Sequence, residues 1–300
     1  MFKGISAIEF CKRFPDNEAC YRYLIKLKWG NGFLCKRCQG RHCSIGRTYY
    51  YRRCTSCKYD ESVTAHTVLH GLKMPMLKIF HILFRLSTKK KGMSSVELGK
   101  EVQIQQKTAW FFKLKIQLTM QLRNNKPLVN HVVVDETLVG GHVKGSYGRV
   151  HETKSVVFTA IEKLPDDRTG NISFTHINNF QVISVRPVID RVVDAEAIIY
   201  ADNFPSYRSI RNSRGRMEIV QSKGSTFFEE IHKQIMTFKM WLSGIHHKCS
   251  KTYLNNYANE YVYRFNRRNQ RKWIFHNLMS EMIKIKPHII HLQGTCEQIT

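Results

Sequence analysis

The second half of the chain carries an ordered series of β-branched segments, and this series limits the fold more than any other feature. Three segments have the composition of successive strands: HVVVDETLV, SVVFTAIE and NISFTHI. A helix-like segment, VISVRPVIDRVVD, follows them, and the strand-like segments AIIYAD and MEIVQS come next. Three strands, a helix, a strand and then alternating helix and strand predict an α/β domain of the RNase H-like type.

Two aspartates and one later helix supply a candidate catalytic set. Asp135 and Asp202 each follow a β-branched run, and a helix is expected from about Thr226 to Ser243. His232 and Lys239 are two turns apart on this helix and project from one side of it. Both lie at the edge of its apolar stripe, which consists of Phe228, Ile231, Ile235, Phe238 and Leu242. Two strand-end carboxylates facing a third ligand are typical of sites that hold two divalent ions, Mg²⁺ or Mn²⁺.

Each member of this set also has an ordinary structural interpretation. His232 taken alone is a packing or surface residue, Asp135 a strand-end cap and Asp202 the opening residue of a turn. Glu229 stands one turn before His232 and is an alternative third carboxylate. The joint order of the residues along the chain favours the metal-site interpretation.

Four of the nine cysteines form two CxxC pairs, Cys35 with Cys38 and Cys54 with Cys57, separated by fifteen residues. Pairs at this spacing place four thiolates around one tetrahedral zinc ion. Disulfides are the alternative, but a chain expected in the cytosol with an odd number of cysteines disfavours them. The alternating segment SIGRTYYYRRC between the pairs predicts a hairpin and therefore a zinc ribbon. Cys43 lies inside this loop and complicates the assignment.

A segment with two predicted helices, KKKGMSSVELGKEVQIQQKTAWFFKLKIQLTM, follows an apolar helix at residues 74–87. A capping box of Ser94 and Glu97 opens the first helix, and a turn near Gln103 leads to the second. The pattern resembles a helix-turn-helix, although Gln103 replaces the common turn glycine. The residues expected to be exposed for base-edge and phosphate contact are Gln105, Gln106, Lys107, Lys113 and Lys115. A helix pair packed on the core with a solvated basic face is the alternative.

The chain has 48 Lys and Arg against 23 Asp and Glu, a formal net charge of +25. Such an excess indicates a polyanionic partner, DNA or RNA, and a basic ribosome-associated protein has a similar balance. Near the end of the predicted catalytic domain, basic residues gather in one short helical segment, which we interpret as a phosphate track or, alternatively, a solvated charged face. These residues are Arg264, Arg267, Arg268, Arg271 and Lys272.

The apolar runs are shorter than the roughly 18 residues that a membrane span requires, and the N-terminus lacks the pattern of a secretory signal. We therefore expect a cytosolic protein. The expected organisation is an N-terminal segment with the ribbon at 1–72, the helix-turn-helix at 73–125, the catalytic domain at 126–275 and a C-terminal helix and tail at 276–300.

These motifs, taken in order, resemble a known family from about Phe14 to Arg271. CYRYLIKLKWGNGFLCKRC and ESVTAHTVLHGLKMP flank the ribbon, and DETLVGG, YADNFPSY and KMWLSGIHHKCSKTYLNNYANEYVYRFNRRN follow. The chain resembles the zinc-ribbon DDE transposases of bacterial insertion sequences, the group related to eukaryotic Merlin elements. One departure is His232, because many members carry glutamate seven residues before the lysine, although asparagine and histidine also occur there.

The resemblance implies a DNA transposase that binds the terminal inverted repeats of an element and cleaves and transfers strands into target DNA. It implies two Mg²⁺ or Mn²⁺ ions, one structural Zn²⁺, and a homodimer on double-stranded DNA near the bacterial nucleoid. A decayed, non-catalytic DNA-binding protein and a metal-dependent nuclease of the RNase H type are the alternatives.

Overall fold

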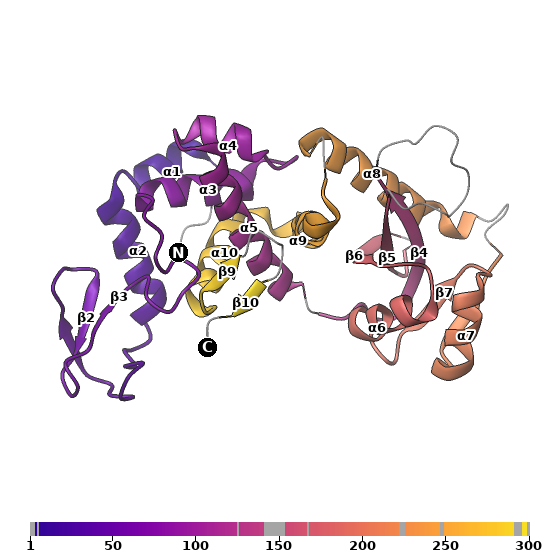
Figure 1. Ribbon diagram of the computed structural model, residues 1–300, viewed down its shortest axis with the longest axis horizontal. Coiled ribbons are helices and arrows are strands. Elements are labelled where there is room, and N and C mark those ends of the chain that lie inside the picture. Colours follow the sequence, from indigo (N-terminus) through magenta and orange to yellow (C-terminus); the bar gives the residue numbers. More distant parts are fainter. Residues whose placement is uncertain are drawn as a thin grey trace. The chain divides into compact units, whose positions relative to one another are not determined.

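The computed structural model describes residues 4, 6–124, 126–140, 154–166, 168–221, 226–246, 249–290 and 296–298. The chain divides into two units, which are described separately here (Figure 1). The first consists of Met1–Thr119 and Asn269–Thr300, and the second of Met120–Arg268. No helix of the described residues is long and apolar enough to cross a membrane.

The first unit is built around a cluster of aromatic rings. Phe10 stacks on Phe84 with ring centroids 4.3 Å apart, and Phe275 lies 5.8 Å from both Phe10 and Phe14. These edge-to-face and stacked contacts add to the gain from burying large apolar areas. A helix close to the C-terminus therefore completes the core of the N-terminal helices. The helices of this unit are α1 (Ala7–Arg13), α2 (Asn17–Trp29), α3 (Met76–Thr88), α4 (Ser95–Glu101), most of α5 (Gln106–Arg123) and α10 (Ile274–Lys284).

A small antiparallel sheet follows α2 in the chain. Its strands are β1 (Cys43–Ile45), β2 (Tyr51–Cys54) and β3 (Asp60–Ser62), in the order β1-β2-β3. The predicted hairpin between the CxxC pairs is thus confirmed. A separate two-stranded ladder joins β9 (His288–Ile290) to β10 (Cys296–Gln298).

Helices α4 and α5 form the pair expected from the sequence. The Ser94 hydroxyl accepts from the backbone N–H of Glu97 at 3.1 Å, as the capping box predicts. Gln103 takes a positive φ of 53° in the turn, the conformation that glycine usually supplies. A Cβ on Gly99 would come within 2.9 Å of the Ile104 carbonyl oxygen, so the close turn requires glycine there.

The second unit contains a five-stranded mixed sheet in the order β6-β5-β4-β7-β8. Strands β4 to β6 are antiparallel neighbours, while β7 runs parallel to β4 and β8 parallel to β7. This strand order confirms the RNase H-like prediction. The strands are β4 (His131–Val139), β5 (Ser155–Lys163), β6 (Thr169–Ile177), β7 (Ile198–Ala201) and β8 (Met217–Ile219).

Helices cover both faces of this sheet (Figure 1). Helices α6 (Val182–Val192) and α7 (Pro205–Arg214) pack on the face that carries Val132 and Val134. Helices α8 (Glu229–Ile245) and α9 (Leu254–Asn266) pack on the face that carries Val133. The predicted stripe of α8 is buried throughout. Side chains alternate between the two faces along a strand, so even-numbered residues of β4 face α6 and α7 and odd-numbered residues face α8 and α9.

Candidate active site and zinc site

The two aspartates lie at the same level of the β4–β7 pair, Asp135 in the middle of β4 rather than at its end and Asp202 one residue after the end of β7. Val133 of β4 pairs with Tyr200 of β7, and Asp135 and Asp202 each follow two residues later. Neighbouring strands are about 4.8 Å apart, and positions two residues apart share a face. Both carboxylates are therefore expected at the carboxyl end of the β4–β7 pair, on the face covered by α8. The Asp202 carboxylate accepts from the backbone N–H of Phe204 at 3.3 Å, which orders the turn into α7.

Helix α8 brings His232 to this edge. Its Nε2 atom lies 3.2 Å from Oδ2 of Asp135, while the other carboxylate oxygen accepts from the Glu136 backbone N–H at 2.8 Å. The His232 side chain is 55% exposed and that of Asp135 17% exposed, so the pair is open to an incoming group. Glu229, the alternative ligand, instead pairs with Lys233 at 3.7 Å.

Lys239 lies farther along the same side of α8 and is half-buried. Burial lowers the pKa of Lys239, the nearby Lys154 lowers it further, and the negative charge of Asp135 opposes both effects. Lys154 immediately precedes β5 and was not singled out from the sequence. The structure thus places the Lys239 ammonium near both Lys154 and Asp135.

The opposite face of β4 carries a second acidic group. Tyr207 of α7 is fully buried, and burial raises its pKa well above the usual range, with Glu136, Asp135 and Asp202 adding to the shift. Glu136 belongs to the face of α7 because it is one residue from Asp135. Sequence reasoning missed this pair, since neither residue stands out without the strand register.

The Asp135–His232 pair fits a divalent ion. Adjacent ligands around an octahedral ion at 2.0–2.1 Å are about 3 Å apart, close to the 3.2 Å observed here. Among the described residues, Asp202 does not form a group of three candidate ligands with Asp135 and His232 as the four cysteines do. The donor set of carboxylates and imidazole suits Mn²⁺ as well as Mg²⁺.

The four predicted zinc ligands form that cluster, with ligand atoms within 4.8 Å of one another. Sγ of Cys35 lies 3.6 Å from that of Cys57, and Sγ of Cys38 lies 3.5 Å from that of Cys54. Four sulfurs at 2.3 Å around tetrahedral zinc are about 3.8 Å apart, so the thiols fit this ion. Backbone hydrogen bonds, first that from Cys57, lower the pKa of the Cys54 thiol to about 6, although burial opposes them.

Two matching backbone turns shape the zinc site. The residues after the CxxC pairs, Gln39 and Lys58, both have φ near +60°. Their N–H groups donate to the carbonyls of Cys35 and Cys54, each at 3.0 Å. Gly40 follows the first turn, and a Cβ there would approach Sγ of Cys54 at 3.2 Å. Cys43 lies opposite Cys54 in the β1–β2 register but is not part of the four-thiol cluster.

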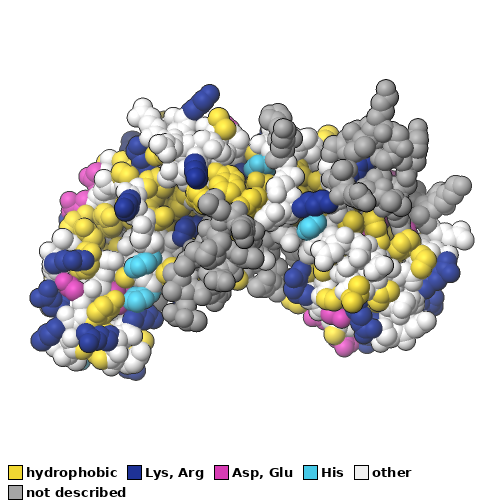
Figure 2. Space-filling view, viewed as in Figure 1, with side chains coloured by type: hydrophobic (Ala, Val, Ile, Leu, Met, Phe, Trp, Pro, Cys, Tyr) yellow, Lys and Arg dark blue, Asp and Glu magenta, His cyan; other side chains and the backbone are white. Residues whose placement is uncertain are grey.

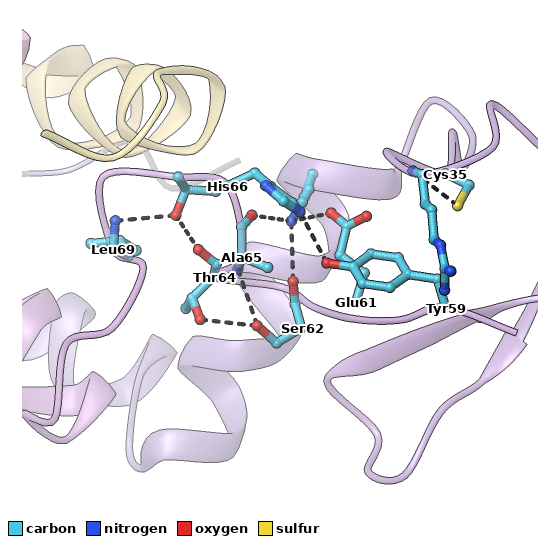
Figure 3. A network of polar contacts seen from close by, with 11 residues as sticks. Cys35, Tyr59, Glu61, Ser62, Thr64, Ala65, His66 and Leu69 are labelled. Atoms are coloured by element: carbon cyan, nitrogen blue, oxygen red, sulfur yellow. Dashed lines mark hydrogen bonds and ion pairs between the residues drawn. The ribbon is translucent and has the colours of Figure 1, made fainter. Parts of the chain in front are cut away.

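A buried ion pair joins the ribbon to α2. Lys28 Nζ lies 2.7 Å from Glu61 Oε1, and the two side chains are 9% and 1% exposed. The same ammonium donates to the carbonyls of Ser62 and Ala65 at 3.1 and 2.7 Å. Figure 3 shows Glu61, Ser62 and Ala65 around this position, with the Tyr59 hydroxyl beside His66. Burial lowers the pKa of Lys28, and Glu61 opposes the shift.

The second helix of the expected DNA-binding pair presents fewer basic groups than the sequence suggested. Gln105, Gln106 and Lys107 are exposed as expected. Lys113 is buried, so the prediction that it is exposed for contact with DNA is wrong. Its side chain is 1% exposed, and its ammonium donates to the Met93 carbonyl at 2.7 Å. Lys115 is half-buried.

The expected phosphate track is not one exposed helix. Helix α9 ends at Asn266, Arg267 is its C-cap, and a short 3₁₀ segment with a non-helical Gln270 follows. Arg264 is largely buried beside Glu260, and Arg268 donates to the carbonyls of Gly170 and Thr169. Arg271 and Lys272 are exposed.

Arg267 serves a structural role in the second unit. Its guanidinium donates to the Arg123 carbonyl at 3.0 Å and to the Asn124 side chain at 3.2 Å, and it stacks on the Tyr263 ring at 3.8 Å. Burial lowers the pKa of Arg267. The excess positive charge is nevertheless widespread, and Figure 2 shows Lys and Arg side chains over much of the visible face with few Asp and Glu.

Two solved structures show a distant likeness. One is the crystal structure of a pre-cleavage Mos1 transpososome, 10% identical, covering 68% of this chain and 78% of that chain with a TM-score of 0.21. The other is a Mos1 transposase paired-end complex with left transposon end, 10% identical, covering 69% and 79% with a TM-score of 0.21. TM-scores this low support no inference about this chain. Comparison with curated proteins gives no match.

Two family models match the chain at the segments that contain the sites described above. Residues 127–266 match the ISXO2-like transposase domain, and residues 15–60 match the transposase zinc-ribbon domain. The first match contains Asp135, Asp202 and His232, and the second contains the four clustered cysteines. The chain therefore belongs to the DDE-type DNA transposases that combine a zinc ribbon with an ISXO2-like catalytic domain.

Proposed function

We propose that this transposase binds the ends of its insertion sequence and uses Asp135, Asp202 and His232 to hold two Mg²⁺ or Mn²⁺ ions for strand cleavage and transfer. The register of the parallel strands β4 and β7, which brings the two aspartates to the same level, carries the proposal. The position of His232, 3.2 Å from Asp135, supports its assignment as the third ligand.

Each residue has a distinct part in this scheme. Asp135, Asp202 and His232 would hold the ions. Bound there, the ions would lower the pKa of a water or a DNA 3′-hydroxyl and stabilise the leaving oxygen. Lys239 supplies a compact positive charge near Asp135 that suits a phosphate of the DNA strand.

The imidazole ligand favours Mn²⁺ over Mg²⁺. Mg²⁺ prefers oxygen ligands and near-ideal octahedral geometry, whereas Mn²⁺ accepts imidazole more readily. A transposase with His232 should therefore depend on Mn²⁺ rather than Mg²⁺ more strongly than one with glutamate at this position.

Recognition of the element end is assigned to the α4–α5 pair and to the exposed basic residues. Gln105, Gln106 and Lys107 open the second helix and are exposed, which suits base-edge and phosphate contact. Arg271 and Lys272 are the exposed remainder of the expected phosphate track. The homodimer stays a prediction, which light scattering of the protein with two element ends would measure.

A supercoiled plasmid that carries one cloned element end tests the proposal against its two alternatives. We expect end-specific nicking or cleavage with Mn²⁺, and none with Asp135→Asn or Asp202→Asn, while both variants retain DNA binding. Binding without cleavage in the wild type under all metal conditions indicates a decayed transposase. Cleavage of RNA–DNA hybrids without preference for the element end indicates a nuclease.

A further inference from the structure

Thr159 is an isolated polar residue in the centre of β5. The strand is buried along almost its whole length, and Thr159 itself is 0% exposed. Its hydroxyl oxygen has no hydrogen-bond partner. A buried hydroxyl without a partner costs free energy, because the group gives up its hydrogen bonds to water. The strand propensity of threonine does not explain the hydroxyl, since valine has the same shape and propensity.

The strand register places one polar neighbour beside this hydroxyl. Thr159 pairs directly with Asp135 on one side and with Phe174 on the other. Val157 and Ile161, two residues away along β5, belong to the apolar cluster that α8 covers. Directly opposed residues in an antiparallel pair share a face, with Cβ atoms about 4.5–5.5 Å apart. Within the sheet, Asp135 is thus the polar group nearest to the hydroxyl on this face.

We propose that Thr159 is a positioning residue for Asp135, donating its hydroxyl hydrogen to the Asp135 carboxylate when that carboxylate binds a divalent ion. In the structure the two Asp135 oxygens are engaged by the Glu136 backbone N–H and by His232. A metal ion would attract the imidazole nitrogen and the same carboxylate oxygen together. A hydrogen bond from Thr159 would then fix the orientation of the carboxylate, as partners of metal ligands commonly do.

This inference rests on the proposed function, because it takes Asp135 to be a metal ligand. The experiment therefore measures Mn²⁺ binding directly, by electron paramagnetic resonance on the full-length, zinc-loaded protein without DNA. Thr159→Val removes the hydroxyl and keeps the shape, while Thr159→Ser keeps the hydroxyl. Asp135→Asn tests the metal site itself. Thr175→Val is the matched control, a threonine in β6 whose partner Phe158 lies on the other face.

We expect Thr159→Val to weaken Mn²⁺ binding about 10- to 100-fold, the usual effect of losing a partner of a metal ligand. Thr159→Ser and Thr175→Val should bind as the wild type does. If Thr159→Val does not fold, Thr159→Ala and Thr159→Ser provide the same comparison of hydroxyl lost against hydroxyl kept.

Two results would overturn the inference while leaving the metal site intact: unchanged Mn²⁺ binding by Thr159→Val, or equal losses in Thr159→Val and Thr159→Ser. The second result would show that packing is responsible. A third result, in which neither the wild type nor Asp135→Asn binds Mn²⁺, would reject the proposed metal site and this inference with it.

Discussion

His232 on helix α8 and Asp135 on strand β4 meet with Nε2 and Oδ2 3.2 Å apart. The contact joins two elements that are almost a hundred residues apart in the sequence. Two charged residues near His232, Glu229 and Lys233, form an ion pair with each other. The helix thus presents His232 to Asp135.

Substitution of His232 should separate a metal ligand from a packing residue. We expect His232→Ala to lose cleavage, since one ligand would be missing, and His232→Glu to keep activity and gain relative activity with Mg²⁺. Cleavage of the plasmid substrate with each metal ion is the measurement.

Glu229→Ala is the control for this series, since it changes the same face of the helix one turn earlier. It should cleave DNA as the wild type does. Wild-type cleavage by His232→Ala together with loss in Glu229→Ala would show that Glu229 is the third ligand.

The sequence was sufficient to predict the strands of the sheet, although it placed Asp135 at a strand end and β4 continues past it to Val139. Alternating or continuous β-branched runs mark strands directly, and β4 begins and ends where the pattern does. The spacing of His232 relative to the apolar stripe predicted its side of α8, because the helical period fixes direction. These are local properties of the chain.

Residues whose environment depends on distant partners were not predictable in this way. Lys113 is buried, with its ammonium donating to the carbonyl of Met93 between α3 and α4, whereas a basic residue on a helix usually faces solvent. The acidic neighbours of Tyr207 and Thr159 are known only from the sheet register, which pairs residues from separate segments. Periodicity within one segment contains no information about such pairs.

Loss of one zinc ligand should affect the ribbon alone. We expect Cys54→Ser to reduce the zinc content from about one ion per chain to nearly none and to unfold the ribbon. Metal analysis of protein purified without chelators measures the first effect, and hydrogen exchange measures the second. The RNase H-like unit should keep its protection, because its core is separate.

Cys43→Ser is the matched control for Cys54→Ser, since the two residues face each other across the same hairpin. It should retain zinc because its thiol lies outside the cluster of four. Equal zinc loss in both variants would show that the ligand set is not the one assigned.

Two neighbouring arginines should affect DNA binding differently. Arg271→Ala should weaken binding to all duplexes. It should also reduce the slope of log affinity against log salt concentration by about the amount that one phosphate contact contributes. Arg267→Ala should instead lower the free energy of unfolding by about 2 kcal/mol, because it removes charged hydrogen bonds to carbonyls. Salt titrations and thermal unfolding measure the two effects. If Arg267→Ala reduced the salt slope without lowering stability, Arg267 would be a phosphate contact and not a structural residue.

Replacing one partner of the buried Lys28–Glu61 pair should lower the free energy of unfolding substantially. Glu61→Gln leaves the Lys28 ammonium without a counter-charge in a buried position, and we expect a loss of about 3–5 kcal/mol in the free energy of unfolding. The double variant Lys28→Met/Glu61→Leu should recover much of this loss, because it buries no charge. Denaturant unfolding followed by circular dichroism is the measurement.

Glu18→Gln provides the comparison on the same helix, since Glu18 pairs with Arg22 at the surface with side chains 52% and 73% exposed. Its stability should be nearly that of the wild type, because solvent and salt screen an exposed pair. If Glu61→Gln were as mild as Glu18→Gln, the hydrogen bonds from Lys28 to the carbonyls of Ser62 and Ala65 would suffice to hold the ribbon to α2. A double variant less stable than Glu61→Gln would show that the ion pair also fixes the packing of α2 against the ribbon.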